Sequence, residues 1–480
     1  MPKPGRRKDD LEEGLLSGAR KLPRSFVTKR TRWWKMLGAL VIVVLCGILV
    51  STEGRASAFT PITPVFPIPE SEQLNWGQYS PYFPLAKYRA PPEGCVIDQV
   101  NILQRHGARF PTSGATAGIV AALAKLQAVP SYEDPALQFL KTFKYDLGTN
   151  DLVPYGAEQS FDAGQLAFTR YSKLISEDNV PFVRADSSER VRVSAVNWTA
   201  GFVAANGNRF IPDPVLVLSS SGNDTLEDTC PNAPPADPQD DAWINTFAPP
   251  ITAKLNAGAP GANLTNIDVY SLISLCPFET VAKQVKSDFC TLFESFPQAF
   301  PGFAYVGDLD KFYGAAYGNP LGRVQGVGWV NELLARLTDA PVRDHTQTNR
   351  TLDGDPRTFP LRRTLYADFS HDNQIASILA ALGLFRQPRP LDPARPDPRR
   401  TFRASALVPF SGRVAVERLR CAAERRVRVL VQDVLQPLEF CGGDAHGMCT
   451  LDAFVESQAY ARHDGEGDFE RCFANRTVEA

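Results

Sequence analysis

One short stretch of the sequence, Arg105-His106-Gly107-Ala108-Arg109, holds residue types that can bind and transfer a phosphoryl group. A guanidinium presents two parallel N–H donors that match two phosphate oxygens. Nearby cations disfavour the charged form of the imidazole, so the ring between the two arginines stays neutral and nucleophilic toward phosphorus even below neutral pH. Gly107 allows close backbone approach, and its carbonyl can orient the ring. We therefore interpret His106 as a nucleophile and both arginines as phosphate ligands.

Two further polar groups could complete such a site. A carboxylic acid that protonates the leaving oxygen of a phosphomonoester speeds the reaction by about 10²–10⁴-fold, and Asp372 has that chemistry. Arg190, and His371 when protonated, add positive charge for the phosphate oxygens. Taken alone, Asp372 would serve equally well as the N-cap of a helix, so the argument depends on the Arg-His-Gly-x-Arg motif. This chemistry needs neither a metal ion nor another cofactor, and metal-ligand spacing is absent from the sequence.

The polar groups follow segments that are typical of buried strands. Apolar, β-branched runs predict strands over 96–103, 180–184 and 364–369, which lead into 105–109, 186–190 and 370–372. Apolar spacing predicts helices over 116–126, 327–337 and 374–384. Alternating strands and helices predict an α/β fold, in which ligand sites gather at the carboxyl ends of the strands. The irregular, helix-rich stretch 200–350 predicts a mostly helical inserted domain that roofs the site.

Composition excludes several classes of protein. With 480 residues, 44% of them apolar and 22% charged, the chain is not disordered, collagenous or a coiled coil. A mean hydropathy of -0.19 excludes a multispan membrane protein. The net charge of -2 argues against nucleic acid as a partner. Residues 1–35 carry eleven Lys/Arg against four acids, so the chain from residue 51 onward is acidic and must bind an anion through a local basic cluster.

The N-terminal segment predicts export. The uncharged apolar run 36–50 follows the basic residues, with Trp33 and Trp34 at its edge. It predicts a signal anchor whose catalytic domain is lumenal or extracellular. The alternative is a cleaved signal peptide and secretion, for which Ala56-Ser57-Ala58 is a suitable cleavage pattern. We expect a cytosolic tail over 1–35, a membrane segment over 33–52, a Pro-rich stalk over 53–73 and a catalytic domain over 74–480, with an α/β core over about 74–199 and 351–480.

Cysteines and glycosylation sequons agree with export. Cys46 lies in the apolar run, which leaves an even set of eight: Cys95, Cys230, Cys276, Cys290, Cys421, Cys441, Cys449 and Cys472. Such a set predicts disulfides, and spacing favours local loops for the close pairs 276/290 and 441/449 without fixing the other pairings. The Asn-x-Ser/Thr sequons all follow the apolar run and predict a glycoprotein: Asn197, Asn223, Asn263, Asn349 and Asn475.

Several stretches together resemble the histidine acid phosphatases, and more narrowly the fungal phytases. The motifs are QRHGARFP at 104–111 and YADFSHDN at 366–373. Flanking matches are NWGQYSPYF at 75–83, LVPYG at 152–156, VRADSSERVRVS at 183–194, NPLGRVQGVGWVNELLARL at 319–337 and VPF at 408–410. The resemblance covers about 74–475. It implies an α/β domain covered by a smaller helical domain.

The resemblance also implies roles and pairings. His106 would carry a phosphohistidine, Asp372 would protonate the leaving alcohol, and Arg105, Arg109, Arg190 and His371 would hold the phosphate. Arg190 fits the family motif better than Arg184 because it stands in a Ser-Ser-x-Arg-Val context. The family's disulfide pattern implies Cys95–Cys421, Cys230–Cys472, Cys276–Cys290 and Cys441–Cys449. The basic leader and the Pro/Arg-rich segment 386–403 depart from the family pattern.

These inferences predict an acid phosphatase whose substrate is a small phosphomonoester, with phytate as the first candidate. One alternative is an acid phosphatase of broad specificity. Another, from a different class, is an inactive membrane-tethered protein that binds inositol polyphosphates.

Overall fold

The computed structural model describes residues 61–219 and 223–474. The expected cytosolic tail, the membrane segment, Cys46 and the sequon at Asn475 lie outside the described residues. Within the described ranges, no helix combines the length and the apolar character needed to cross a membrane.

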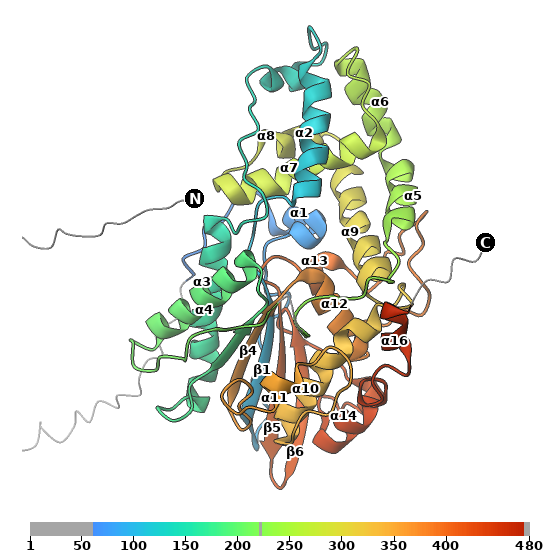
Figure 1. Ribbon diagram of the computed structural model, residues 1–480. Coiled ribbons are helices and arrows are strands. Elements are labelled where there is room, and N and C mark those ends of the chain that lie inside the picture. The colour runs from blue at the N-terminus through green and yellow to red at the C-terminus, as the bar shows by residue number, and fades with distance from the viewer. Residues whose placement is uncertain (1–60, 220–222, 475–480) are drawn as a thin grey trace, which may run out of the picture. The chain divides into compact units, whose positions relative to one another are not determined.

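Among the described residues, one eight-stranded sheet has a parallel half and an antiparallel half (Figure 1). Its order is β3-β2-β4-β1-β5-β6-β7, and β8 pairs with β6. The strands are β1 Cys95–Arg105, β2 Phe182–Ala185, β3 Leu216–Val217, β4 Leu365–Ser370, β5 Arg413–Cys421, β6 Glu424–Val431, β7 Val434–Leu435 and β8 Cys449–Thr450. Strands β3, β2, β4 and β1 run parallel, whereas β5 pairs antiparallel with β1 and starts a meander. The α/β prediction is confirmed.

The register of the parallel strands brings their carboxyl ends together. Arg105 of β1 pairs with Ser370 of β4, and Phe369 of β4 pairs with Ala185 of β2. Residues 99–105 and 365–370 are buried throughout, because helices cover both faces of this half of the sheet. The residues that follow each strand therefore meet at one edge.

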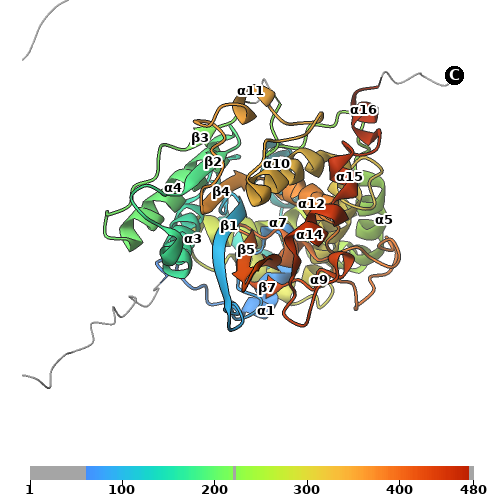
Figure 2. The same ribbon diagram turned by 90° about the horizontal axis from the view of Figure 1, so that it is seen from below.

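Helices account for most of the remaining chain. They are α1 Glu70–Gln73, α2 Ser113–Gln127, α3 Pro154–Tyr171, α4 Glu189–Ala205, α5 Asp237–Phe247, α6 Pro249–Gly258, α7 Asn266–Lys283, α8 Asp288–Glu294, α9 Ala299–Ala315, α10 Val327–Thr338, α11 Arg350–Asp353, α12 Asp372–Ala381, α13 Ala404–Leu407, α14 Leu451–Ser457, α15 Ala459–Arg462 and α16 Asp468–Phe473. Seen along the sheet, α3 and α4 cover one face, and α10, α12 and α14 cover the other (Figure 2).

The helical domain is assembled from two separate parts of the chain. Helices α5 to α9 come from the expected insertion, but α2 packs against α7 and joins them beyond the end of the sheet (Figure 1). Helix α2 contributes Ile119 and Leu123 to their common core. At the other boundary, α10 lies against α12 and α15 and so belongs with the sheet. The predicted bounds of the inserted domain, 200 and 350, differ from this arrangement. Sequence order does not reveal which helices pack together.

The described part of the expected stalk, residues 61–73, packs onto the domain. Phe66 and Ile68 are buried in its core, and Phe66 lies 4.6 Å from Tyr155, measured between ring centroids. The backbone N–H groups of Ile62 and Thr63 donate to Asp162 of α3 at 2.8 and 2.9 Å. The catalytic domain therefore starts before residue 74, since the prolines of this segment shape a surface strap rather than a free linker.

Among the described residues, two disulfides connect distant parts of the chain and two close local loops. Cys95–Cys421 joins the paired ends of β1 and β5, Cys276–Cys290 joins α7 to α8, and the others are Cys230–Cys472 and Cys441–Cys449. These are the pairs that the family resemblance implies. Each cross-link restricts the unfolded chain, an effect of typically 2–4 kcal/mol.

Candidate active site

The candidate site lies at the carboxyl ends of the parallel strands. His106 follows β1, Asp186 follows β2, and His371 follows β4. The N–H of His106 donates to the carbonyl of Ser370 at 3.1 Å, so the two catalytic segments are joined by their backbones. His371 is the N-cap of α12, and Asp372 occupies its first turn, where a carboxylate suits the helix dipole.

His106 is held as a neutral imidazole. Its Nδ1 lies 2.8 Å from the carbonyl oxygen of Gly107, which can only accept, so Nδ1 carries the hydrogen and Nε2 keeps a free lone pair. Burial lowers the pKa of His106 well below its usual value, and four neighbours lower it further: Arg105, Arg109, His371 and Arg190. The ring is therefore unprotonated in acid, which is the state that a nucleophile requires.

Two glycines allow the chain to pack tightly beside this ring. A Cβ on Gly107 would lie 2.1 Å from the carbonyl oxygen of Gly156, and one on Gly156 would lie 2.1 Å from that of Ala108. No side chain fits in either place. The start of α3 thus supports the loop that carries His106 and Arg109.

The three arginines predicted as phosphate ligands converge on His106. Arg105 is fully buried, donates to the carbonyls of Gln78 and Val408, and stacks over Phe410 with its Cζ 4.7 Å from the ring centroid. Burial is the main reason that its pKa falls to about 10, so it stays charged in acid.

These guanidiniums keep donors free for a ligand. The Nε atoms of Arg105, Arg109 and Arg190 are buried and have no hydrogen-bond partner. Burial, followed by the charge of Arg109, lowers the pKa of Arg190. An anion stabilises positive charges that lie close together in a buried space and have unpaired hydrogen-bond donors. Phosphate offers oxygen acceptors that match these donors.

Arg184, the alternative to Arg190, has a structural role. Its guanidinium binds Glu332 at 2.6 Å and Asp368 at 2.9 Å, and all three side chains are buried. Arg336 binds the same Asp368 at 2.7 Å. These carboxylates already use the donors of Arg184, so it is not available to a phosphate.

Asp372 lies among cations. Its Oδ2 is 2.9 Å from a terminal nitrogen of Arg105 and 3.3 Å from Nζ of Lys311. Burial alone would raise the pKa of Asp372, but Arg105, Lys311, Arg109 and His106 together lower it well below its usual value. These charges favour the ionised form of the carboxyl group in the free site.

A family comparison agrees with this geometry. The family model described as the histidine phosphatase superfamily (branch 2) matches residues 96–432. The chain belongs to this superfamily. A phytase A of Aspergillus terreus is 41% identical over 426 residues, spanning 83% of this chain and 90% of the relative. Phytase A of Neurospora crassa is 38% identical and spans 83% of this chain and 92% of its own.

Solved structures share the fold of this histidine phosphatase. The phytase from D. castellii has a TM-score of 0.70 at 22% identity and covers 85% of this chain and 88% of its own. A multiple inositol polyphosphate phosphatase from Bifidobacterium longum, in complex with inositol hexasulfate, has a TM-score of 0.57 at 15% identity. It covers 79% of this chain and 96% of its own.

Two site residues of this histidine phosphatase were not assigned from its sequence. Lys311 of α9 is buried, with Nζ 2.6 Å from Oδ1 of Asn373 and 2.8 Å from Asp310. It follows no strand and belongs to no motif, so only the packing of α9 beside the start of α12 reveals it. Asp186 stands in the predicted 186–190 cluster, and its Oδ1 accepts from Nε2 of His371 at 2.7 Å.

One cluster of described residues has the spacing of metal ligands. Ligand atoms of Asp186, Glu227 and His371 lie within 4.8 Å of one another. Nε2 of His371 is already hydrogen-bonded to Asp186, and Arg190 on the other side of His371 favours an anion. The described residues therefore fit phosphate better than a cation.

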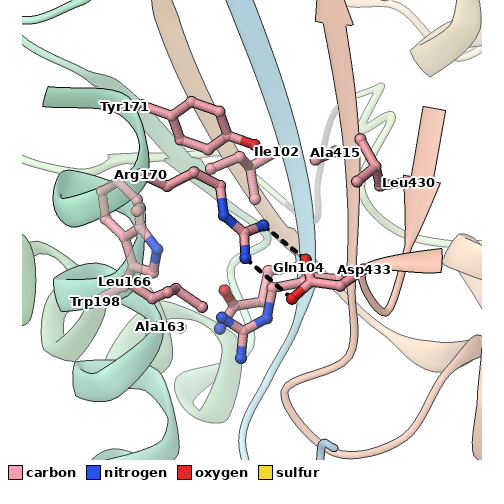
Figure 3. Close-up of a pocket in the computed structure, with 12 residues that line it drawn as sticks. Ile102, Gln104, Ala163, Leu166, Arg170, Tyr171, Trp198, Ala415, Leu430 and Asp433 are labelled. Atoms are coloured by element: carbon pink, nitrogen blue, oxygen red, sulfur yellow. Dashed lines mark hydrogen bonds and ion pairs between the residues drawn. The ribbon is translucent and has the colours of Figure 1, made fainter. Parts of the chain in front are cut away.

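A separate pocket lies between the sheet and α3 of this histidine phosphatase. Arg170 and Asp433 form two bonds of 2.6 and 3.0 Å across it, and Tyr171 and Trp198 line one side (Figure 3). Its free volume of about 20 Å³ suits a water molecule rather than a substrate. None of the predicted catalytic or phosphate-binding residues lines it.

Proposed function

We propose that this chain is an acid phosphomonoesterase that hydrolyses myo-inositol hexakisphosphate (phytate) to lower inositol phosphates and phosphate through a phosphohistidine intermediate. The observation that carries the proposal is the neutral ring of His106, which is surrounded by three arginines with unpartnered Nε–H donors. The relatives named phytase A support the choice of substrate.

In the first step, Nε2 of His106 attacks phosphorus while the bond from phosphorus to the inositol oxygen breaks. Arg105, Arg109 and Arg190 hold the other phosphate oxygens and stabilise the charge that develops on them. The Nδ1–H bond to Gly107 keeps the ring in place and stabilises the positive charge that it gains.

Asp372 protonates the leaving oxygen. The dianionic phosphate offsets Arg105 and Lys311, the cations that keep Asp372 ionised in the free site. Asp372 can then take up a proton from an acidic medium and deliver it to the inositol alkoxide.

In the second step, water replaces the departed inositol. The Asp372 carboxylate, now deprotonated, accepts a proton from this water as it attacks phosphorus. The bond from phosphorus to Nε2 breaks, phosphate leaves, and His106 returns to its neutral state.

The competing proposal is an acid phosphatase with no preference for phytate. The relatives named phytase A favour phytate, and Lys311 adds a buried cation beside Asp372. We expect kcat/KM to be at least tenfold higher for phytate than for glycerol 2-phosphate at pH 5. Equal values would favour broad specificity, and binding of phytate without release of phosphate would indicate the inactive binding protein.

The four disulfides fit an exported catalytic domain. For the leader, we propose membrane anchoring through 33–52, with secretion after cleavage as the alternative. Activity that stays in the membrane pellet after carbonate extraction supports the anchor, whereas activity in the medium supports secretion. Of the described sequons, Asn223 and Asn263 are exposed and Asn197 and Asn349 are half-buried, so we propose the first two as the more accessible glycosylation sites.

A further inference from the structure

A buried carboxylate next to an anion site needs an explanation. Asp186 is fully buried, immediately follows β2, and lies beside the arginine cluster through its contact with His371. A negative charge in this position repels phosphate and loses its own hydration. A neutral side chain in this position would avoid both costs, unless the carboxylate has a further role in the site.

The contacts of His371 define that function. Asp186 can only accept, so Nε2 of His371 carries the hydrogen in their 2.7 Å bond. On the other side of the ring, Nδ1 lies 3.3 Å from a terminal nitrogen of Arg190, which can only donate. Asp186, His371 and Arg190 thus form a chain that ends at the phosphate ligands. The ring of His371 also lies 5.7 Å from that of His106, measured between centroids.

We propose that Asp186 is a positioning residue for the phosphate site: it fixes the ring of His371 so that Nδ1 faces the phosphate beside Arg190, and it stabilises the proton that Nδ1 takes up when phosphate binds. The inference rests on the proposed function. A phosphomonoester that is protonated on one oxygen in acid loses this proton among the arginines. The O–H bond breaks, an N–H bond forms at Nδ1, and the resulting imidazolium lies between Asp186 and the phosphate dianion.

The state of Asp186 suits this role. Burial alone would raise its pKa, but hydrogen bonds from His371 and from the N–H of Ser188 lower it to about 2. The carboxylate is therefore ionised across the acidic range. Other groups face His371: Arg190 of α4, His106 after β1, and Glu227, whose pKa burial and the charge of Asp186 raise.

The simpler explanation is that Asp186 only caps a turn. Its Oδ1 accepts from the N–H of Ser188 at 2.9 Å, just before α4. This explanation and ours predict opposite effects on anion binding. If Asp186 only caps, then Asp186→Asn removes a repulsive charge and anions bind equally well or more tightly. If it positions His371, the same change weakens binding.

Inositol hexasulfate is a suitable probe, because its charge does not change between pH 4 and 7 and it is not hydrolysed. We expect calorimetry to show binding by Asp186→Asn about tenfold weaker than wild type at pH 5, which is the lower end of the 10–100-fold effects known for carboxylates that orient metal-ligating histidines.

Glu227→Gln is the matched control. It removes a carboxylate from the same cluster that has no hydrogen bond to His371 among the described residues, so binding should be unchanged or tighter. Asp186→Ser keeps an oxygen that can cap the turn, and it should lose binding as Asp186→Asn does. Unfolding midpoints near the wild-type value show that each variant is folded.

Wild-type or tighter binding by folded Asp186→Asn and Asp186→Ser would overturn the proposal. So would a loss of activity on dialysis against EDTA, because it would assign the cluster to a cation. Failure of the proposed function looks different, since the wild type would then bind the probe but release no phosphate from phytate.

Discussion

A terminal nitrogen of Arg105 lies 2.9 Å from Oδ2 of Asp372, so the proposed phosphate ligand at the end of β1 also holds the proposed proton donor at the start of α12. In the proposed mechanism, this contact couples substrate binding to proton delivery. Phosphate draws the charge of Arg105 to itself, and the pKa of Asp372, which is well below its usual value in the free site, rises. The acid thus becomes able to carry a proton when a leaving group is in place.

The first prediction concerns the role of Asp372 as an acid. Asp372→Asn should lower kcat for phytate and glycerol 2-phosphate by about 10²–10⁴-fold, because each must expel a basic alkoxide. The loss should be much smaller for the first step with p-nitrophenyl phosphate, whose leaving group needs no proton. Steady-state and burst kinetics with the three substrates measure this difference. Equal losses of the first step would refute the acid role.

The second prediction concerns Lys311, which lies 3.3 Å from Asp372. A nearby cation favours the carboxylate, so Lys311→Met should raise the pKa of Asp372. Because the reaction needs this group protonated, the alkaline limb of kcat/KM should move to higher pH, by about one unit. An unchanged limb would show that Lys311 does not govern the proton of Asp372.

The third prediction concerns activity in acid. Arg109 is one of the charges that lower the pKa of His106, so Arg109→Gln should raise it and move the acid limb of kcat/KM to higher pH. Arg192→Gln is the control, since Arg192 is exposed on α4 and pairs with Glu189. A limb that shifts equally in both variants would argue against a local effect on His106.

The fourth prediction separates Arg184 from Arg190. Removing one partner of a buried ion pair typically costs about 3–5 kcal/mol, so Arg184→Met should lower the free energy of unfolding by about that amount. The folded fraction should still bind phosphate. Arg190→Met should reduce binding of phosphate with less effect on stability. Denaturant unfolding measures stability, and inhibition by phosphate measures binding. A loss of phosphate binding in Arg184→Met and a loss of stability in Arg190→Met would contradict this assignment.

The fifth prediction concerns the packing of α3 beside the His106 loop. Gly156→Ala places a methyl group 2.1 Å from the carbonyl oxygen of Ala108, so we expect about 1–3 kcal/mol of destabilisation and at least tenfold lower kcat/KM. Gly114→Ala, in the first turn of α2, meets no atom within 4 Å and should be neutral or slightly stabilising. Similar losses in both variants would contradict the packing argument.

The parallel half of the sheet was predictable because its strands are continuous apolar runs. The predicted segments 96–103, 180–184 and 364–369 overlap β1, β2 and β4. Their carboxyl ends meet by topology alone, so residues far apart in the chain could be assigned to one site. The six catalytic and phosphate-binding residues inferred from motif and resemblance do converge there.

The features that the sequence did not reveal depend on tertiary packing. Lys311 reaches Asp372 because α9 packs beside the start of α12, and no local signal marks this contact. Asp186 belonged to a recognised polar cluster, but only the geometry shows that it holds His371 rather than phosphate. Helix α2 joins the helical domain through its contact with α7, which sequence order conceals.

Trapping of the phosphoenzyme shows whether His106 carries the phosphoryl group during turnover. Wild-type enzyme is mixed with ³²P-labelled phytate at pH 5, denatured within milliseconds in alkali, where phosphohistidine survives, and digested for peptide mapping. We expect label on His106 in the wild type, and neither label nor phosphate release in a folded His106→Ala variant. Phosphate release by His106→Ala at a rate near that of the wild type, or label on another residue, would contradict it.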